Sequence, residues 1–331
     1  MTTPQIRCEL IVDAVQVACR APSLHNTQPW RWVVAGNTVD LYVDPSRRVD
    51  VADRNGRQAL LSCGAVLDHF RVAIGAAGWH ADVTRFPDRT DPHHLASVVL
   101  TPAASVSRQQ RSRADAIMAR RTDRLAFAEP PEGLDALVAS VHAAEHTGSV
   151  RLDIIADDRR SSLMDISQIT DALRLYDARY HDELGWWTDT FVSDVGIPAN
   201  ALISAPESDR VAVGRNFPVT NRPERRSEIA EDHAHILVVS SVDDSRESVL
   251  RCGEILSAIL LDATLSGLAT CTVTHVTEVD AGRDVVASLI GGRAIPQALI
   301  RIGLAPAFET PPPPTPRRHV SDVLQIRSDP S

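Results

Sequence analysis

Two long segments are apolar on nearly every side and predict the two central helices of the protein. The first runs from Gln58 to Gly78 and the second from about Ser248 to Gly267. A helix that is apolar all round is buried in a core or spans a membrane. Since neither segment reaches the roughly 18 consecutive apolar residues that a span needs, both are predicted to be buried core helices.

The second apolar segment repeats the first at a constant offset of 189 residues. The matching positions are Cys63-Gly64 with Cys252-Gly253, Leu67 with Leu256, and Gly78 with Gly267. Any two buried helices share Ala and Leu, but a Cys-Gly pair and a terminal glycine at equal spacing favour duplication. We therefore predict one body built of two related halves, residues 1–112 and 113–331.

Alternating and continuous apolar runs predict strands around these helices, and helical spacing predicts further helices. The expected strands are Trp30–Ala35, Val39–Val43, Ala96–Leu100, Val150–Ala156, His235–Ser241, Ala269–His275 and Ala298–Leu304. The expected helices are Val12–Arg20, Leu134–His146 and Arg160–Asp177. The fold class is therefore α+β.

The segment from about residue 180 to 232 has no clean periodicity. It combines Trp186-Trp187, Phe191 and Phe217 with many charged residues, prolines and glycines. We interpret it as an insertion that packs over another part of the protein, as a lid would. A short basic turn that enters a helix is expected near the end, at residues 315–324.

Composition narrows the class of protein. The chain has 331 residues, 44% of them hydrophobic but only 4% aromatic, so its core is mostly aliphatic. A net charge of −9 argues against nucleic acid or an anionic membrane as a partner. The N-terminus lacks the apolar stretch of a signal peptide, which predicts a cytoplasmic protein.

The cysteines and histidines give no sign of a metal site. Five cysteines without C-x-x-C spacing fit free thiols better than a disulfide framework or a zinc site. The histidines near residues 91–94 and 233–235 also lack metal spacing. All 34 basic residues are arginine, so any site for an anion must be built from guanidinium groups.

The loop between the first helix and the first strand, Ala21 to Trp30, gathers small hydrogen-bonding side chains between two prolines. Pro22 ends the helix, because proline lacks an N–H and disfavours helical geometry in the preceding residue. Two interpretations are open from composition alone: a loop that satisfies its own backbone, and a rigid turn that presents its polar groups to a ligand.

A second candidate is the run Arg120-Arg121-Thr122-Asp123-Arg124. Guanidinium groups bind phosphate oxygens through paired, charge-assisted hydrogen bonds. Taken alone, the run also fits a solvated cluster of charges.

The pattern A-P-S-x-x-N-x-Q-P-W-R-W, at residues 21–32, resembles the flavin loop of the nitroreductase family, and of its duplicated single-chain branch in particular. Members are FMN-dependent oxidoreductases that work as homodimers. The resemblance implies a nitroreductase-like fold whose two halves mimic that homodimer. It also implies FMN contacts from Pro22, Ser23, Leu24, Asn26 and Gln28.

Three more segments resemble motifs of this family. Residues 120–124 resemble its R-R-S-x-R motif, which implies that Arg120, Arg121 and Thr122 hold the FMN phosphate and that Arg124 lies by the flavin pyrimidine. Arg317-Arg318 resembles the closing R-K-P-L segment, a further phosphate contact, although His319 replaces its proline. Thr272, Val273 and Thr274 correspond to the segment along the isoalloxazine ring. Cys271 is interpreted as an ordinary buried thiol.

The distribution of these motifs implies one FMN site per chain. In the family dimer the arginine motif comes from one subunit and the P-S-x-x-N loop from the other, and here each occurs once. The resemblance therefore implies a monomer that acts as an intramolecular pseudo-dimer, with one composite FMN site. Whether it assembles further stays open.

Two functions follow from the resemblance. The first is an NAD(P)H-dependent oxidoreductase that reduces small acceptors such as nitroaromatics or quinones. The alternative is a protein that sequesters or senses FMN beneath the lid, with little turnover. A third interpretation is a structural relic that binds no flavin. No catalytic residue is assigned.

Overall fold

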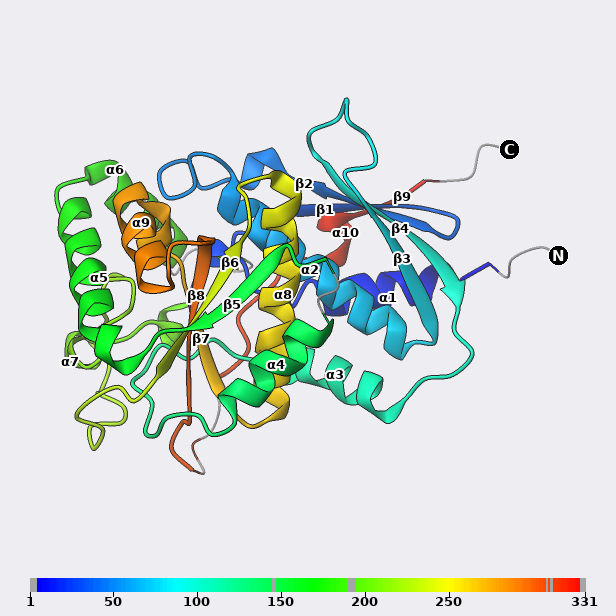
Figure 1. Ribbon diagram of the computed structural model, residues 1–331. Helices are drawn as coiled ribbons and strands as arrows, with labels where there is room; N and C mark the ends of the chain where they lie inside the picture. The colour runs from blue at the N-terminus through cyan, green and yellow to red at the C-terminus, as the bar shows by residue number, and fades with distance from the viewer. Residues whose placement is uncertain (1–4, 145–146, 190–194, 308, 310–311, 328–331) are drawn as a thin grey trace.

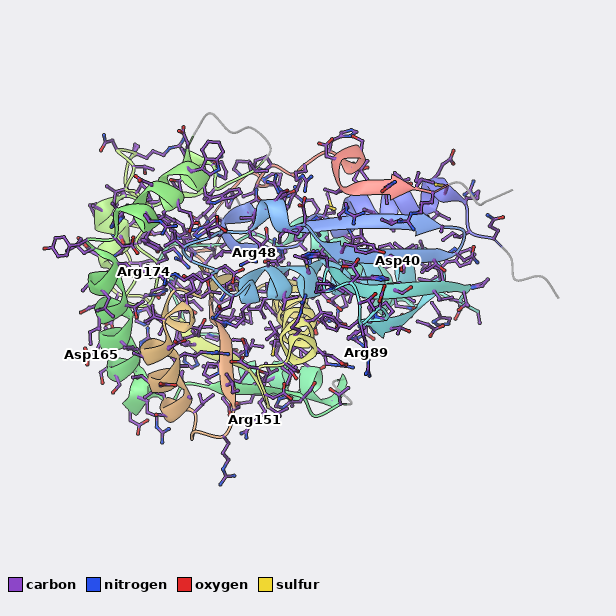
Figure 2. All side chains as sticks on the ribbon, turned by 90° about the horizontal axis from the view of Figure 1, so that it is seen from above. Asp40, Arg48, Arg89, Arg151, Asp165 and Arg174 are labelled. Carbon is purple, nitrogen blue, oxygen red and sulfur yellow. The ribbon has the colours of Figure 1, made fainter. Side chains whose placement is uncertain are left out.

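The protein forms two sheets on either side of a pair of long central helices (Figure 1). The computed structural model describes residues 5–144, 147–189, 195–307, 309 and 312–327. Its central pair consists of α2 (Arg57–Ala76) and α8 (Arg246–Leu265), which lie next to each other in both views (Figures 1 and 2). One hydrophobic core joins both helices to both sheets. The two predicted core helices are thus confirmed.

The central helices meet backbone to backbone at two glycines. A Cβ atom built on Gly64 would lie 2.0 Å from the Leu250 carbonyl oxygen, and one built on Gly253 would lie 2.1 Å from that of Leu61. Adding 189 to the numbers of Leu61 and Gly64 gives Leu250 and Gly253. Each helix therefore makes the same glycine-to-carbonyl contact with the other. Reciprocal contacts of this kind define a two-fold axis, here within one chain.

The two sheets repeat the same strand order. Their strands are β1 (Trp30–Ala35), β2 (Thr38–Val43), β3 (Trp79–Arg85), β4 (His94–Pro102), β5 (Val150–Ile154), β6 (His235–Ser241), β7 (Ala269–Val273), β8 (Ile295–Gly303) and β9 (Leu324–Ile326). The first sheet has the order β3-β4-β2-β1-β9 and the second β7-β8-β6-β5. Within each four-stranded unit all pairings are antiparallel. The predicted α+β fold with two related halves is confirmed.

The C-terminal segment of the chain connects the second half to the sheet of the first half. β9 follows the whole second half, yet pairs parallel to β1 of the first sheet, with Trp32 opposite Leu324. This pairing draws residues 312–318 across the loop that precedes β1. The predicted boundary between residues 112 and 113 falls inside α3 (Arg108–Ala119).

Besides α3, the remaining helices are α1 (Cys8–Ala18), α4 (Leu134–Ala144), α5 (Arg160–Arg174), α6 (Ala178–Thr188), α7 (Ala205–Asp209), α9 (Asp280–Leu289) and α10 (Val320–Val323). Among them, α1, α3 and α4 pack against the central pair, whereas α5 and α9 lie on the outer side of the second sheet (Figure 1). α2 alone among the described helices is long and apolar enough to cross a membrane, but most of it is buried inside the protein. It is therefore a core helix, as predicted.

The insertion contains α6, α7 and long irregular stretches, and lies beside α5 and α9 (Figure 1). Tyr180, Leu184 and Trp187 of α6 form a small core with Val49 and Ala52 of the first half. The insertion therefore bridges the two halves on the side where the loop at residues 21–30 lies. Phe191, which the sequence analysis placed here, is outside the described residues.

Candidate functional site

The loop between α1 and β1 has an unusual backbone. His25, Asn26 and Gln28 have φ values of 49°, 58° and 52°, in the left-handed region that side chains with a Cβ seldom adopt. Such strain persists only where surrounding contacts fix it, and it concentrates at functional sites. The contacts around this loop therefore fix a strained backbone, which fits the rigid turn expected from the two prolines.

The polar side chains of this loop bind mainly to protein backbone. The Ser23 hydroxyl accepts from the Gln28 N–H at 3.0 Å, and the Gln28 amide accepts from the Arg318 N–H at 2.9 Å. Asn26 donates to the Gly196 and Pro316 carbonyls at 2.9 and 3.1 Å. The loop therefore satisfies much of its own backbone, and Asn26 ties it to the insertion and to the C-terminal tail.

Beside the loop is a central cavity, whose empty space measures about 1000 Å³ when the adjoining open solvent is included. Its walls come from the loop, from α2 and α8, from β7 and from the insertion. The loop, motif and strand residues that line it are Pro22, Ser23, Leu24, His25, Thr122, Arg124, Cys271, Thr272, Val273 and Thr274. Three of the four predicted segments therefore meet at one cavity: the loop, the arginine motif and residues 272–274. The described residues of the C-terminal tail do not line it.

A second cavity of about 600 Å³ adjoins the first and shares Ser23, Thr122 and Arg124 with it. We call it the arginine cavity, because Arg20, Arg120, Arg121 and Arg317 line it together with Asn26. None of these four arginines forms an ion pair with a carboxylate among the described residues. A group of guanidinium ions without counter-charge is suited to an anion such as phosphate.

The charges in the arginine cavity destabilise one another. Burial and, to a smaller extent, the neighbouring charges of Arg20 and Arg121 lower the pKa of Arg120 to about 10. Burial and Arg20 also hold the pKa of Arg317 well below its usual range. Like charges brought together in a buried place gain most from a bound anion, because it relieves both effects at once.

Arg124 lines the central cavity, as do Arg215 and Arg301. The Arg124 guanidinium donates to the Ala201 carbonyl at 3.2 Å and lies 5.2 Å from the ring centre of Phe217. His25 meets the same ring edge to face. Burial, aided by the charge of Arg215, lowers the pKa of His25 to about 3, so that its imidazole is neutral at physiological pH. The cavity thus combines a buried charge, a neutral imidazole and an aromatic wall from the insertion.

Two predicted residues lie away from both cavities. The Arg318 guanidinium donates to the Asp322 carbonyl at 2.8 Å and lies 3.8 Å from the Asp44 carboxylate, outside the described cavity walls. Gln28 is fully buried and bonds to the Asn26 carbonyl. Both residues support the loop rather than face a ligand.

Several wall residues were not predicted. His25 lies within the loop motif and Arg20 just before it, so that their positions in the sequence offered a signal. Ser62 of α2, Arg301 of β8 and Phe217 of the insertion gave none, because only the packing of distant segments brings them to the cavity.

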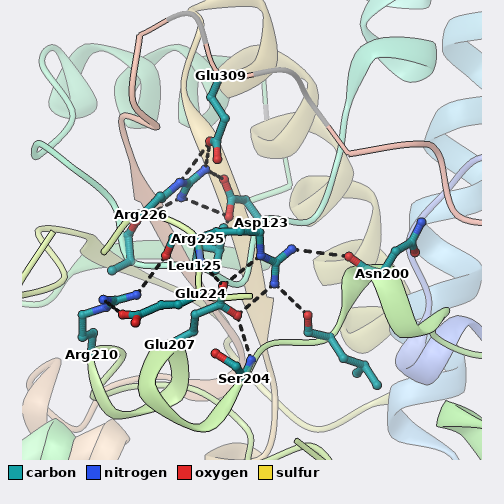
Figure 3. Close-up of polar contacts among 12 residues, drawn as sticks. Asp123, Leu125, Asn200, Ser204, Glu207, Arg210, Glu224, Arg225, Arg226 and Glu309 are labelled. Carbon is teal, nitrogen blue, oxygen red and sulfur yellow. Dashed lines mark hydrogen bonds and ion pairs between the residues drawn. The ribbon is translucent and has the colours of Figure 1, made fainter. Parts of the chain in front are cut away.

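The base of the insertion is fastened to the arginine motif by ion pairs (Figure 3). The Arg226 guanidinium donates to the Asp123 carboxylate at 2.7 Å and also pairs with Glu309. The neighbouring Arg225 pairs with Glu207 at 2.9 Å. Arg226 is buried with a φ of 53°, a strained conformation that these contacts fix.

The other end of the insertion is fastened by a buried carboxylate. Glu278 accepts from the Thr274 hydroxyl at 2.7 Å and from Arg174 of α5 at 3.0 Å, and it pairs with Arg215 of the insertion. Arg215 also donates to the Tyr180 hydroxyl at 2.6 Å. We call Glu278, Arg174, Arg215 and Tyr180 the latch, because they join the insertion to the floor of the cavity.

The latch makes stability depend on pH in acid. Burial raises the pKa of Glu278, but Arg215 and Arg174 lower it by more, from 4.5 to about 2. A pKa lowered by folding adds stability above pH 4.5 that is lost as the pH falls toward 2. We therefore expect the urea-unfolding free energy to fall more steeply over this window in the wild type than in Glu278→Gln. Equal slopes would contradict the latch.

Comparisons with known proteins point to one family. No family model matches the chain. It is 54% identical over 328 residues, 99% of both chains, to the protein named "Putative NAD(P)H nitroreductase acg" of Mycobacterium tuberculosis. It is 38% identical over 326 residues to "Putative NAD(P)H nitroreductase Rv3131" of the same organism, covering 96% of this chain and 91% of that one.

Solved structures similar to this chain carry similar names. One is a nitroreductase with bound FMN from Bacteroides fragilis, which is 14% identical. The alignment covers 61% of this chain and 93% of that chain, with a TM-score of 0.40.

Proposed function

Since the chain belongs to the nitroreductase family, we propose that it binds FMN and uses NAD(P)H to reduce small acceptors such as nitroaromatics or quinones. The observation that carries this proposal is the arginine cavity, which has no carboxylate partner among the described residues and adjoins a cavity lined by apolar, aromatic and hydroxyl groups, as an anion joined to a ring system requires. FMN has these two parts, a phosphate and an isoalloxazine ring. The residues present therefore fit this cofactor.

The protein's own residues would hold and orient the flavin. Arg120 would bind the phosphate, while the loop at residues 22–25 and the segment at 272–274 would line the cavity that holds the ring. Arg124 is our candidate beside the pyrimidine, where a positive charge favours the anionic reduced form. When bound, FMN would supply hydride and electron transfer between NAD(P)H and the acceptor.

We propose one flavin per chain, because the position related by the internal two-fold is differently lined. The offset of 189 residues relates Thr274 to Arg85 and Ser62 to Arg251, which line a separate cavity with Glu254. There Arg85 donates two hydrogen bonds of 2.7 Å to Glu254. At these two related positions the central cavity has the small hydroxyl side chains of Thr274 and Ser62, whereas the other cavity has arginine side chains that pair with carboxylates. A cytoplasmic, monomeric pseudo-dimer remains our expectation.

An alternative function is sequestration of FMN, and one observation favours it. The insertion is fastened to the protein at both ends of the cavity, by Arg226 at its base and by Arg215 in the latch. Phe217, two residues from Arg215, lies over Arg124 inside the cavity. A closed insertion of this kind would bury a bound flavin and restrict the access of acceptors.

One spectroscopic experiment tests the proposed function. The purified protein is mixed with FMN, freed of excess flavin, and treated anaerobically with NADPH and then NADH. We expect retained flavin whose visible absorbance bleaches. Flavin that is retained but reduced only by dithionite would support sequestration instead, and in that case Phe217→Ala should allow bleaching by NAD(P)H. No retained flavin would contradict both proposals.

A further inference from the structure

Apart from Arg124, which lines both cavities, the four guanidinium groups of the arginine cavity differ in how many of their donors are already committed. Arg317 donates from Nε to the Cys19 carbonyl at 2.8 Å, and from Nη2 to those of Arg20 and Ala21 at 3.0 and 3.2 Å. Its Nη1 donates to the hydroxyl of Thr315 and to the carbonyl of Pro316. All three nitrogens of Arg317 are therefore occupied by protein oxygens.

Arg121 is committed through two of its three nitrogens. Its Nη1 donates to the carbonyls of Met118, Ala119 and Arg120 at 2.7, 3.2 and 2.9 Å, at the end of α3. Its Nε donates to Pro312 at 3.1 Å. Arginine at a helix C-terminus stabilises the last carbonyls and the helix dipole. Arg121 and Arg317 thus bind the ends of α3 and α1 to the C-terminal tail.

Arg120 and Arg20 have donors to spare. Arg120 is buried, and its one bond to the described protein runs from Nη2 to the Arg20 carbonyl at 3.3 Å. Its buried Nε has no partner. Arg20 makes one bond within the described residues, from Nη1 to the Thr315 carbonyl at 2.9 Å. A buried N–H without a partner is destabilising unless a ligand satisfies it.

We infer that Arg20 and Arg120 donate hydrogen bonds that hold the flavin phosphate, whereas Arg317, whose nitrogens all bind protein oxygens, positions the wall around it. This inference rests on the proposed function. It assigns the phosphate to one arginine from each half: Arg20 follows α1 and Arg120 follows α3. It also makes Arg317 a positioning residue, whose charge acts on the ligand but whose donors do not.

Paired titrations test the inference. Apoprotein is titrated with FMN and with riboflavin, which has the same ring but no phosphate, and flavin fluorescence reports binding. We expect Arg20→Gln to weaken FMN binding by about 10- to 100-fold, as for a charge-assisted hydrogen bond. Riboflavin binding should stay within about 3-fold of wild type, because the ring cavity is intact. Arg108→Gln, an exposed change on α3, is the control and should alter neither affinity.

Arg317→Gln gives the contrasting result. We expect it to weaken FMN and riboflavin together and to lower the melting temperature, because it releases the tail and the end of α1. Unchanged FMN affinity in Arg20→Gln, or an equal loss of both flavins, would overturn the role of Arg20. An Arg317→Gln variant that lost only the preference for FMN would overturn the division of roles.

A third measurement separates this inference from the proposed function. Inorganic phosphate is added to apoprotein at constant ionic strength, and the melting temperature is recorded. We expect phosphate to raise it in the wild type and not in Arg20→Gln. If the wild type retained no flavin but showed this difference, the proposed function would fail and the phosphate site would stand. The absence of any phosphate effect in the wild type would overturn the site itself.

Discussion

Gly253→Ala is expected to lower the free energy of unfolding by about 4 kcal/mol or more, or to prevent folding altogether. The new Cβ would lie 2.1 Å from the Leu61 carbonyl oxygen and 2.9 Å from the Gly64 Cα. Both are backbone atoms of the facing helix, so no side-chain rotation can relieve the clash. α2 and α8 would have to separate, and the core between the two sheets would open.

Gly75→Ala is the matched control, since it makes the same change in α2. There the nearest atom to a built Cβ is the Gln110 side-chain nitrogen at 3.8 Å, which is ordinary contact. Alanine also favours a helix over glycine, so this variant should gain roughly 0.5–1 kcal/mol. Urea denaturation followed by circular dichroism measures both. If Gly253→Ala lowered the free energy of unfolding by less than about 1 kcal/mol, the two helices would have to shift apart at little cost. That result would contradict the close contact described here.

The same glycines explain why much of the fold was predictable. The Cys-Gly pair marks the point where the two helices cross, and Gly78 and Gly267 end their helices with left-handed φ values of 88° and 74°. The glycines that repeat in the sequence thus occupy equivalent positions in the two central helices or at their ends. β1 and β6 also agree with their predicted bounds, because each is a short apolar run between turn residues.

The elements that the sequence did not reveal lack such a pattern. α3 is mostly polar and buries little beyond Ala116 and Ile117. Its apolar stripe is therefore too narrow for the sequence pattern to predict a helix. β3 has only half-buried positions on its inward face, and β9 is three residues long. β9 exists because the tail reaches β1, a contact between residues some 290 positions apart that no local pattern encodes.

The candidate site, too, could be predicted from the sequence only in part. The family resemblance implied that Arg120, Arg121 and Arg317 lie near one anion site, and the structure brings them to one cavity. The sequence does not show which guanidinium donors the chain itself uses, because the carbonyls that Arg317 binds lie almost 300 residues away. Nor could it place Phe217, since the insertion folds over the cavity through ion pairs with distant segments.

Asp232→Ala should destabilise the protein by roughly 3–5 kcal/mol, because it leaves Arg301 buried without its counter-charge. The two side chains are 5% and 1% exposed, and two bonds of 2.9 and 2.7 Å join them. The second carboxylate oxygen accepts from the Phe127 N–H at 2.9 Å. Arg301 also donates to the Leu125 carbonyl at 3.0 Å, so the pair fixes the chain just after the arginine motif.

Two variants show whether burial makes this ion pair important. Glu247→Ala removes the partner of Arg251 in a pair whose carboxylate is 51% exposed, and it should change stability by less than about 0.5 kcal/mol. Asp232→Ala/Arg301→Met should lose less than Asp232→Ala, because it removes the stranded charge together with its partner. Urea unfolding measures all three. If the double variant were the least stable, the loss would come from the backbone groups of Leu125 and Phe127, and the penalty of a buried charge would not be its cause.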